Sequence, residues 1–428
     1  MKAGIISLGC PKNRVDSEHI LGLLKRVGYT LTNDVEDADI IFINTCGFIT
    51  DSKKESIETI LDNIAKNKKV VVTGCLVERY LNDLKKEIPE VDLWIPISDY
   101  DRFTDRLKEI DKSIPSTYGL DYHFRMLSSG PYTAYLRIGE GCSNHCSYCA
   151  IPLIRGEYIS RPLSEIISEA RHLASIGIKE LVVLEQDTTK YGLDFNDGTS
   201  IVTLLHELLK IKEFAFIRLL YLYPDEISDE LISLIAKEER LTTYFDIPIQ
   251  HSEDHILKDM NRRGNKNDLY ELFNKIKSNV PHPILRTTIM VGFPGETEED
   301  VDRLIDFMND IKFNHLGVFT YSKEEDTPSY DYPNQIDEEV KRARLDKVMR
   351  AQQSISYRNN KKMVGLTMKG MIFAKEHNHY LLRSYFNAPD NIDGKILVES
   401  SHPLKIGDIV NVKIKEAFVY DLIAEVID

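Results

Sequence analysis

The sequence is short of positive charge and of long apolar runs, and each shortage argues against a class of protein. Lys and Arg total 54 against 68 Asp and Glu, which gives 428 residues a formal net charge of −14. Proteins that act mainly by neutralising phosphates usually carry the opposite balance, so a basic protein is favoured over a nucleic acid as the main partner. No stretch approaches the roughly 18 apolar residues of a membrane span. The N-terminus also lacks the long apolar segment and cleavage site of a signal peptide, so we expect a cytoplasmic protein.

Cysteine is also scarce, with six residues in the whole chain. In a reducing compartment these thiols are not expected to form disulfides. Metal ligation or catalysis is therefore the favoured explanation of all six.

The first hundred residues alternate β-rich runs with helical patterns, which predicts a parallel sheet. Helical patterns lie near 16–27, 51–66 and 78–88. The strand-like runs are AGIISLGC (3–10), DIIFINTC (39–46) and KVVVTGC (69–75), and each ends in a cysteine. Because the carboxyl ends of parallel strands share one edge, we expect Cys10, Cys46 and Cys75 to gather there. The alternative for any one of them is a buried structural cysteine.

Residues 100–130 lose this pattern and are predicted to be a linker. A second alternating series then begins. Its candidate strands are 134–138, 180–184, 216–222, 243–249, 284–291 and 315–321, and its clearest helices are 163–176 and 297–311, the latter capped by Thr297. Six such units predict a partial (βα)6 barrel, with the chemistry on the loops that follow the strands.

The last third of the chain changes character twice. Residues 335–363 form a long charged helical pattern with little apolar surface, which we interpret as a connector. Short β-rich runs from 363 to 428 then predict a small all-β barrel. The expected fold class is a multidomain α/β protein with an N-terminal parallel α/β domain, a partial (βα)6 barrel and this C-terminal barrel.

The stretch GCSNHCSYC (141–149) places Cys142, Cys146 and Cys149 at the spacing CxxxCxxC, on the first loop of the expected partial barrel. Three thiolates can hold three irons of a [4Fe–4S] cluster and leave the fourth iron open to a small molecule. The alternative is zinc completed by His145 or another side chain. No second CxxC or HxxxH lies nearby to finish a tetrahedral site, which disfavours zinc.

This motif, with Tyr148 before its last cysteine, resembles that of the radical S-adenosylmethionine (SAM) superfamily. The resemblance implies that SAM binds the open iron and is cleaved to a 5′-deoxyadenosyl radical. It also places Tyr148 near the adenine; the alternative, a core aromatic, is less favoured in this motif than for a lone tyrosine.

The order of the domains resembles that of the methylthiotransferases within this superfamily. The resemblance implies a second [4Fe–4S] cluster on Cys10, Cys46 and Cys75 and a C-terminal barrel of the TRAM type. The expected domains are 1–110 with this auxiliary cluster, 131–334 as the radical SAM core, 335–362 as a connecting helix and 363–428 as the TRAM-like barrel.

Several stretches resemble the protein-modifying branch of the family rather than the branch that modifies an adenosine in transfer RNA. They include LGCPKNRVDSE (8–18), LEQDTTKYG (184–192), VGFPGETEED (291–300) and RSYFNAPDNIDG (383–394). This resemblance implies methylthiolation of the β-carbon of an aspartate in small-subunit ribosomal protein S twelve, with flavodoxin or ferredoxin as electron donor. Residues 363–428 hold seven Lys and Arg against nine Asp and Glu, which also favours a basic protein substrate. The alternatives are a transfer-RNA substrate, or an iron–sulfur electron carrier or sensor without SAM cleavage.

Other polar residues and glycines are weaker candidates. Family analogy places Gln186, Asp187 and Thr188 near the ribose or amine of SAM and Arg218 near its carboxylate, although strand-end residues often cap the next helix. Gly292 and Gly295 are expected to let the backbone turn closely near the adenine, or to form a turn without a ligand. Arg262 and Arg263 are candidates to bind an acidic group of a ligand. The alternative is that they are ordinary solvated surface.

Overall fold

The computed structural model describes residues 1–114, 118–122, 124–390 and 392–427. These residues form two compact units, each assembled from separate stretches of the chain. Unit 1 contains 1–128, 135–172 and 322–330, while unit 2 contains 129–134, 173–321 and the described part of 331–428. Residues 115–117 and 123 of the predicted linker lie outside the described residues.

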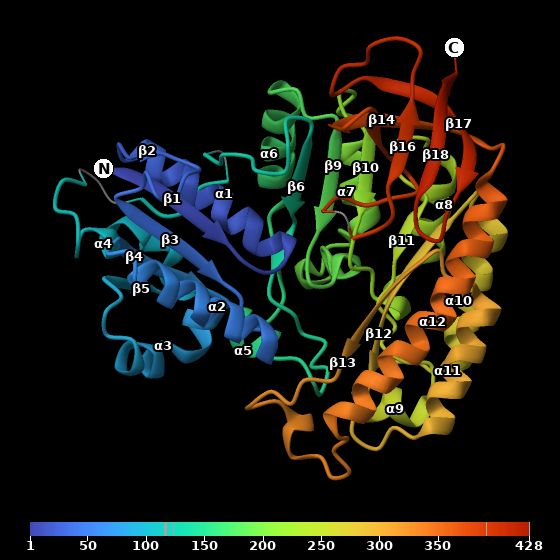
Figure 1. Ribbon diagram of the computed structural model, residues 1–428, viewed down its shortest axis with the longest axis horizontal. Coiled ribbons are helices and arrows are strands. Elements are labelled where there is room, and N and C mark those ends of the chain that lie inside the picture. The colour runs from blue at the N-terminus through green and yellow to red at the C-terminus, as the bar shows by residue number, and fades with distance from the viewer. Residues whose placement is uncertain (115–117, 123, 391, 428) are drawn as a thin grey trace. The chain divides into compact units, whose positions relative to one another are not determined.

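The N-terminal part of unit 1 is a parallel α/β layer structure, as the sequence predicted (Figure 1). Its sheet has the order β2-β1-β3-β4-β5, and every neighbouring pair is parallel. The elements are β1 (Lys2–Ser7), α1 (Pro11–Arg26), β2 (Thr30–Leu31), β3 (Ile40–Thr45), α2 (Thr50–Ile64), β4 (Lys69–Gly74), α3 (Cys75–Glu87), β5 (Leu93–Ile95) and α4 (Phe103–Leu107). All five strands therefore end at the same edge of the sheet.

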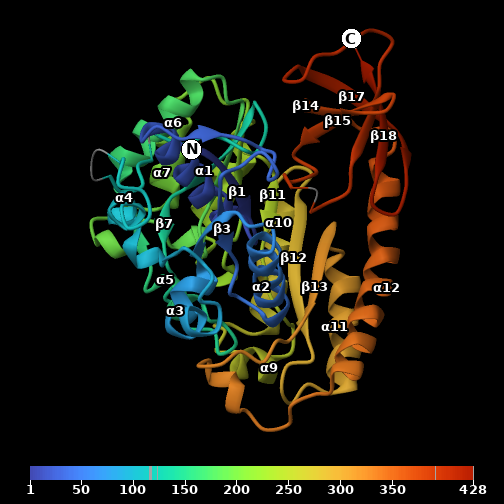
Figure 2. The same ribbon diagram turned by 60° about the vertical axis from the view of Figure 1, so that its left-hand side comes forward.

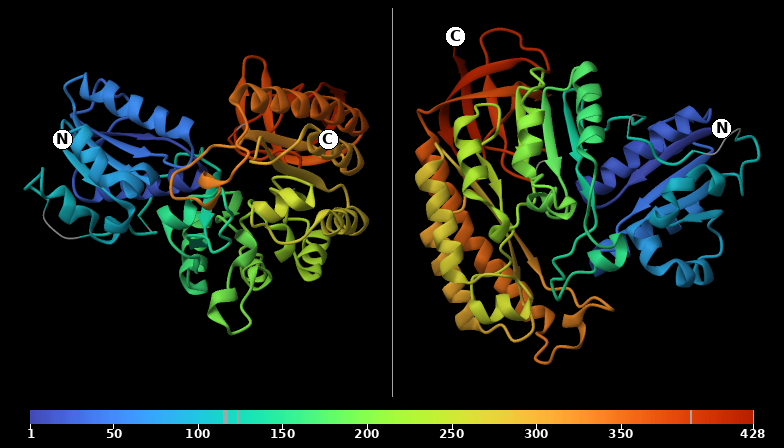
Figure 3. Two further views of the ribbon diagram at one scale, coloured as in Figure 1. Left: turned by 90° about the horizontal axis from the view of Figure 1, so that it is seen from below. Right: turned by 180° about the vertical axis from the view of Figure 1, so that it is seen from behind.

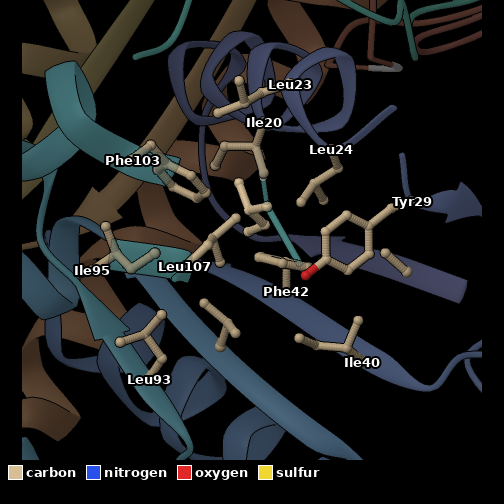
Figure 4. Close-up of a cluster of buried hydrophobic side chains, with 13 residues drawn as sticks. Ile20, Leu23, Leu24, Tyr29, Ile40, Phe42, Leu93, Ile95, Phe103 and Leu107 are labelled. Carbon is tan, nitrogen blue, oxygen red and sulfur yellow. The ribbon is translucent and has the colours of Figure 1, made fainter. Parts of the chain in front are cut away.

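The strand residues alternate between two buried faces, which explains why these runs are continuously apolar. Ile40 and Phe42 face a core formed with α1 and α4, including Leu24 and Phe103 (Figure 4). The intervening Ile41 and Ile43, with Val70 and Val72, face α2 and α3 instead. Helices thus cover both faces of the sheet and leave its carboxyl edge for the loops.

The structure corrects several of the predicted element boundaries in this region. Helix α1 begins at Pro11 rather than near 16, because proline is favoured in the first turn of a helix. Helix α3 begins at Cys75 itself rather than at 78. The short strands β2 and β5 were not predicted, since two or three residues are too few to show periodicity.

The segment expected to be a linker is packed against α1. The Arg125 side chain is 1% exposed and lies between Glu18, at 2.6 Å, and Glu169, also at 2.6 Å. At Gly22 of α1 an added Cβ would lie 1.9 Å from the carbonyl oxygen of Phe124. Periodicity missed this packing because ion pairs and close backbone contacts, rather than an apolar stripe, hold the segment.

The middle of the chain contains two three-stranded sheets, of order β10-β9-β6 and β11-β12-β13, and a two-stranded antiparallel sheet of β7 and β8. Strands β9 and β10 are parallel, as are β11, β12 and β13. The strands are β6 (Thr133–Arg137), β7 (Gly139–Glu140), β8 (Ile159–Ser160), β9 (Glu180–Leu184), β10 (Phe216–Leu219), β11 (Tyr244–Asp246), β12 (Ile284–Val291) and β13 (His315–Thr320). The helices are α5 (Ile151–Arg155), α6 (Leu163–Ser175), α7 (Ile201–Leu208), α8 (Asp229–Lys237), α9 (Asp254–Asp259), α10 (Lys266–Asn279), α11 (Glu298–Ile311) and α12 (Glu338–Met363). Thr297 caps α11 as expected, because its side chain accepts a hydrogen bond from the Asp300 backbone.

Helix α12 does more than connect, which corrects the sequence interpretation. It packs beside α11 and β13 within unit 2 (Figure 3). Its buried face is largely polar but hydrogen-bonded: Gln352 Nε2 donates to the Phe313 carbonyl at 2.8 Å, and Lys341 Nζ to the Tyr321 carbonyl at 3.0 Å. A low apolar content therefore did not mean an exposed helix.

The C-terminal strands close into a five-stranded barrel of order β14-β15-β16-β18-β17, as predicted (Figure 2). They are β14 (Thr367–Glu376), β15 (His379–Ser384), β16 (Ile396–Glu399), β17 (Ile409–Ala417) and β18 (Leu422–Ile427). Across the described residues, every helix is too short or too polar to pass through a lipid bilayer.

Candidate functional site

Cys10, Cys46 and Cys75 follow β1, β3 and β4 at the carboxyl edge of the unit 1 sheet. Two glycines bring the loops together. Gly9, at φ +87°, lies so near Cys46 that an added Cβ would be 3.1 Å from its sulfur, and Gly74, at φ +96°, lies against Asn44 and Thr45. Only glycine combines this backbone geometry with so little room. The parallel sheet therefore brings the three cysteine loops together, as expected.

The three thiols influence one another electrostatically and differ in burial. Burial raises the pKa of Cys46, and it raises the pKa of Cys75 to about 11 although the Arg155 charge opposes this. Negative charge on Cys10, whose residue is exposed, would raise both values further. An iron ligand must be a thiolate, so metal binding here would have to displace protons that burial otherwise retains.

A buried polar network, which the sequence did not predict, surrounds Cys75. Asn13 Nδ2 donates to the carbonyls of Leu8, at 3.1 Å, and Thr45, at 2.9 Å, and so ties the loops that follow β1 and β3. Its Oδ1 accepts from the Cys75 thiol at 3.4 Å and from Arg155 at 2.7 Å. The position of Asn13 could have indicated this role, because it comes one turn after Cys10 in the helix that follows the first cysteine.

Cys142, Cys146 and Cys149 occupy the loop between β7 and α5, also in unit 1. Cys142 and Cys146 are buried, and the Cys149 amide donates to the Cys146 carbonyl at 3.0 Å. Burial and the neighbouring Cys146 raise the pKa of Cys149. Tyr148 is 9% exposed, so it contributes a largely buried aromatic face to this loop.

Each set of three cysteines fits an iron–sulfur cluster with three protein ligands. His145, a possible ligand under the zinc alternative, is 56% exposed, and its Nε2 lies 3.4 Å from Glu157 Oε1. Among the described residues, no three His, Cys, Asp or Glu side chains converge on one point that would suit a single ion. In a [4Fe–4S] cluster each thiolate binds a different iron, so such convergence is not required.

Apart from Arg218 of β10, the remaining candidates for SAM contacts lie in unit 2 after β9 and β12. Gln186 is half-buried; Asp187 is fully buried and accepts a hydrogen bond from Thr189. Thr188 donates to the Leu220 carbonyl at 2.6 Å, so its hydroxyl is used within the fold. Gly292 has φ +76° and an added Cβ would lie 2.3 Å from Lys341, whereas Gly295, at φ +84°, borders open space.

The three arginines expected to meet ligands make extensive contacts inside unit 2. Arg218 is fully buried; its Nε donates to Glu180 at 3.1 Å and its Nη2 to the Ser384 carbonyl at 2.5 Å. Arg262 donates to the Pro248 carbonyl at 2.6 Å, and Arg263 pairs with Asp225 at 2.6 Å. The structure therefore assigns each arginine a structural contact.

Sequence comparisons cover all three parts of the chain. Residues 2–96 match the uncharacterized protein family UPF0004, residues 136–308 the Radical SAM superfamily, and residues 364–427 the TRAM domain. Among curated proteins, the ribosomal protein uS12 methylthiotransferase RimO of Clostridioides difficile strain 630 is 47% identical, over 100% of this chain and 99% of the relative. The RimO of Alkaliphilus oremlandii strain OhILAs is 46% identical over 99% of both chains.

Solved structures show the same fold at low identity. A radical S-adenosylmethionine methyltransferase, TsrM from Kitasatospora setae, aligns with a TM-score of 0.55 and 12% identity, over 88% of this chain and 79% of its own. The cobalamin-dependent S-adenosylmethionine radical enzyme OxsB aligns with a TM-score of 0.52 and 11% identity, over 83% of this chain and 56% of its own. With the two sets of three cysteines in place and full-length identity well above 40%, this chain belongs to the RimO family of radical SAM methylthiotransferases.

Proposed function

We propose that this chain adds a methylthio group to the β-carbon of an aspartate in ribosomal protein uS12. The observation that carries the proposal is the presence of two sets of three cysteines in a chain that matches RimO proteins over its whole length. Membership of the family implies SAM and a [4Fe–4S] cluster. The proposal adds a second cluster, so that Cys10, Cys46 and Cys75 hold one and Cys142, Cys146 and Cys149 the other.

The reaction needs a radical because the β C–H bond of an aspartate is not acidic enough for a general base at neutral pH. When bound, SAM and the cluster at Cys142, Cys146 and Cys149 supply that radical chemistry. The chain's own contribution would be to hold each set of thiolates and so to supply three protein ligands to each cluster. Tyr148, which is largely buried, is the proposed aromatic neighbour of the adenine.

Other SAM contacts are assigned to unit 2. The side chains of Gln186 and Asp187, which follow β9, and the backbone at Gly292, which follows β12, are the proposed polar contacts. Arg218 remains a candidate contact for the SAM carboxylate, because its Nη1 has no hydrogen-bond partner among the described residues. Its other contacts to Glu180 and Ser384 favour a structural role.

The proposed domains are 1–110, 131–334, 335–362 and 363–428, with the three family matches lying inside the first, second and fourth. The acidic composition of the chain supports a basic protein partner rather than transfer RNA. A flavodoxin or ferredoxin is the proposed electron donor.

Mass spectrometry of uS12 from cells with and without the gene tests the substrate. We expect one aspartate to carry a methylthio group only when the gene is present. Unchanged uS12 together with altered transfer RNA would contradict the proposal. Anaerobically reconstituted protein is expected to hold about eight irons per chain and to cleave SAM after reduction, which an electron carrier or sensor would not do.

A further inference from the structure

Arg155 belongs to the segment of the second cysteine loop but contacts the first set of thiols. It is the last residue of α5, six residues after Cys149, and its side chain is 1% exposed. Its Nη2 lies 3.5 Å from the sulfur of Cys75, 80 residues away in sequence. Both residues lie in unit 1.

The guanidinium group is held in this position by several acceptors. Nη2 also donates to Asn13 Oδ1 at 2.7 Å and to Asp16 Oδ2 at 2.8 Å, so its two hydrogens serve three acceptors and the contact to Cys75 is a shared one. Nη1 lies 3.4 Å from Glu140. Asp16 is fully buried, and its other oxygen accepts from Arg137 Nη1 at 2.6 Å. Because Asp16 is shared between two arginines, Arg155 cannot leave Cys75 without breaking a buried ion-pair network.

An N–H donor at a ligating sulfur has a defined effect on an iron–sulfur cluster. Hydrogen bonds to the sulfurs and nearby positive charge both stabilise the reduced, more electron-rich state, and both therefore raise the reduction potential. At Cys75 the interaction is buried, so solvent screens it little.

We propose that Arg155 is a positioning residue of the N-terminal cluster. It directs its positive charge and a shared Nη2 hydrogen at the Cys75 thiolate, and both raise the reduction potential of that cluster. It also ties the position of the cluster to the segment that carries the other three cysteines. This inference rests on the proposed function, in that it requires a cluster on Cys10, Cys46 and Cys75.

The test uses the full chain with Cys142, Cys146 and Cys149 replaced by alanine, so that one cluster remains. Its midpoint potential is measured by an anaerobic redox titration followed by electron paramagnetic resonance. Arg155→Gln is expected to make reduction on the order of tenfold less favourable, since a charge-assisted hydrogen bond is lost. Tenfold corresponds to about 59 mV more negative for one electron.

Arg155→Lys keeps the charge but cannot reproduce the forked contacts, so a smaller negative shift is expected. The lysine variant also provides the measurement if glutamine prevents the cluster from assembling. An unchanged potential in either variant would overturn the inference.

Arg125→Gln is the matched control. Arg125 is equally buried in unit 1, and its ion pairs are with Glu18 and Glu169 rather than with a cysteine. It is expected to lower stability and leave the potential unchanged, whereas an equal shift in this control would show a general structural effect and contradict the inference. If the parent variant bound no iron, the second cluster and this inference would both be wrong; about four irons with an unchanged potential would overturn the inference alone.

Discussion

His19 in α1 is a buried histidine that the fold keeps neutral. Burial lowers its pKa to about 3, and the nearby Arg125 charge acts in the same direction. Its Nδ1 lies 3.0 Å from the Asp121 carbonyl, and its ring meets Tyr122 edge-on. An unfolded chain would take up a proton at this side chain near pH 6.5, whereas the folded chain would not.

This difference predicts how the stability of unit 1 depends on pH. Below pH 6.5 the unfolded state binds the extra proton, so the free energy of unfolding falls as the pH is lowered toward 3. Between pH 7 and 5 the loss from this residue is about 2 kcal/mol, and His19→Gln should remove it. Urea unfolding followed by the fluorescence of Trp94, the single tryptophan of the chain, measures the effect. The exposed His172→Gln is the control and should behave as the wild type; an equal pH dependence in His19→Gln would contradict the prediction.

Two glycines separate the cost of a backbone angle from the cost of crowding. Gly28 and Gly74 have nearly the same φ, +97° and +96°, but an added Cβ meets no atom within 4 Å at Gly28 and lies 2.3 Å from Asn44 Oδ1 at Gly74. Gly28→Ala should cost about 1–2 kcal/mol from φ alone. Gly74→Ala should cost more and displace the adjacent Cys75, so reconstituted iron should fall from about eight to about four per chain. Equal stability and iron content in the two variants would contradict this prediction.

At the scale of elements, residues 322–330 form a strap that completes unit 1 from a distant part of the sequence. Glu324, 1% exposed, lies 2.8 Å from both Arg79 of α3 and Lys53 of α2. The Ser329 amide donates to the Ser147 carbonyl at 2.9 Å, inside the second cysteine loop. The strap therefore contacts α2, which follows the Cys46 loop, and α3, which begins at Cys75. It also contacts the backbone of the loop that holds Cys142, Cys146 and Cys149.

Removing the buried carboxylate of the strap should destabilise unit 1. Glu324→Ala leaves Arg79, 3% exposed, without its closest carboxylate, which should cost about 3–5 kcal/mol. Its neighbour Glu325 is 52% exposed, and Glu325→Ala should cost less than about 1 kcal/mol. The urea midpoint reported by Trp94 compares the two, and a similar loss in both would show that burial of Glu324 does not matter.

On the whole-molecule scale, the net charge of −14 predicts salt-sensitive association with a basic protein. Raising salt from about 0.1 M to about 1 M shortens the Debye length from about 10 Å to about 3 Å. The rate at which the chain associates with uS12 should then fall by at least about tenfold. Stopped-flow measurements across this range test the prediction, and a rate that does not change with salt would contradict it.

The sequence predicted what depends on regular patterns. Alternating runs indicated the N-terminal parallel sheet, and the position of Cys10, Cys46 and Cys75 after its strands brought their loops to one edge. The CxxxCxxC spacing and short β-rich runs likewise indicated the second thiol loop and the closed barrel. The sequence did not reveal Arg155 at Cys75, because that contact joins residues 80 positions apart through a buried ion-pair network. Burial of charged groups in α12 was missed for the same reason: it depends on partners that no local pattern shows.

The discontinuous construction of unit 1 has a consequence for its synthesis. Arg79 and Glu324 are separated by 245 residues, so the ribosome adds the carboxylate long after the arginine. At 5–20 residues per second the delay is roughly 12–50 s. During that interval the nascent N-terminal layer lacks the carboxylate that pairs with Arg79 in the finished fold, and its cysteine loops cannot acquire their final supports until three-quarters of the polypeptide has been translated.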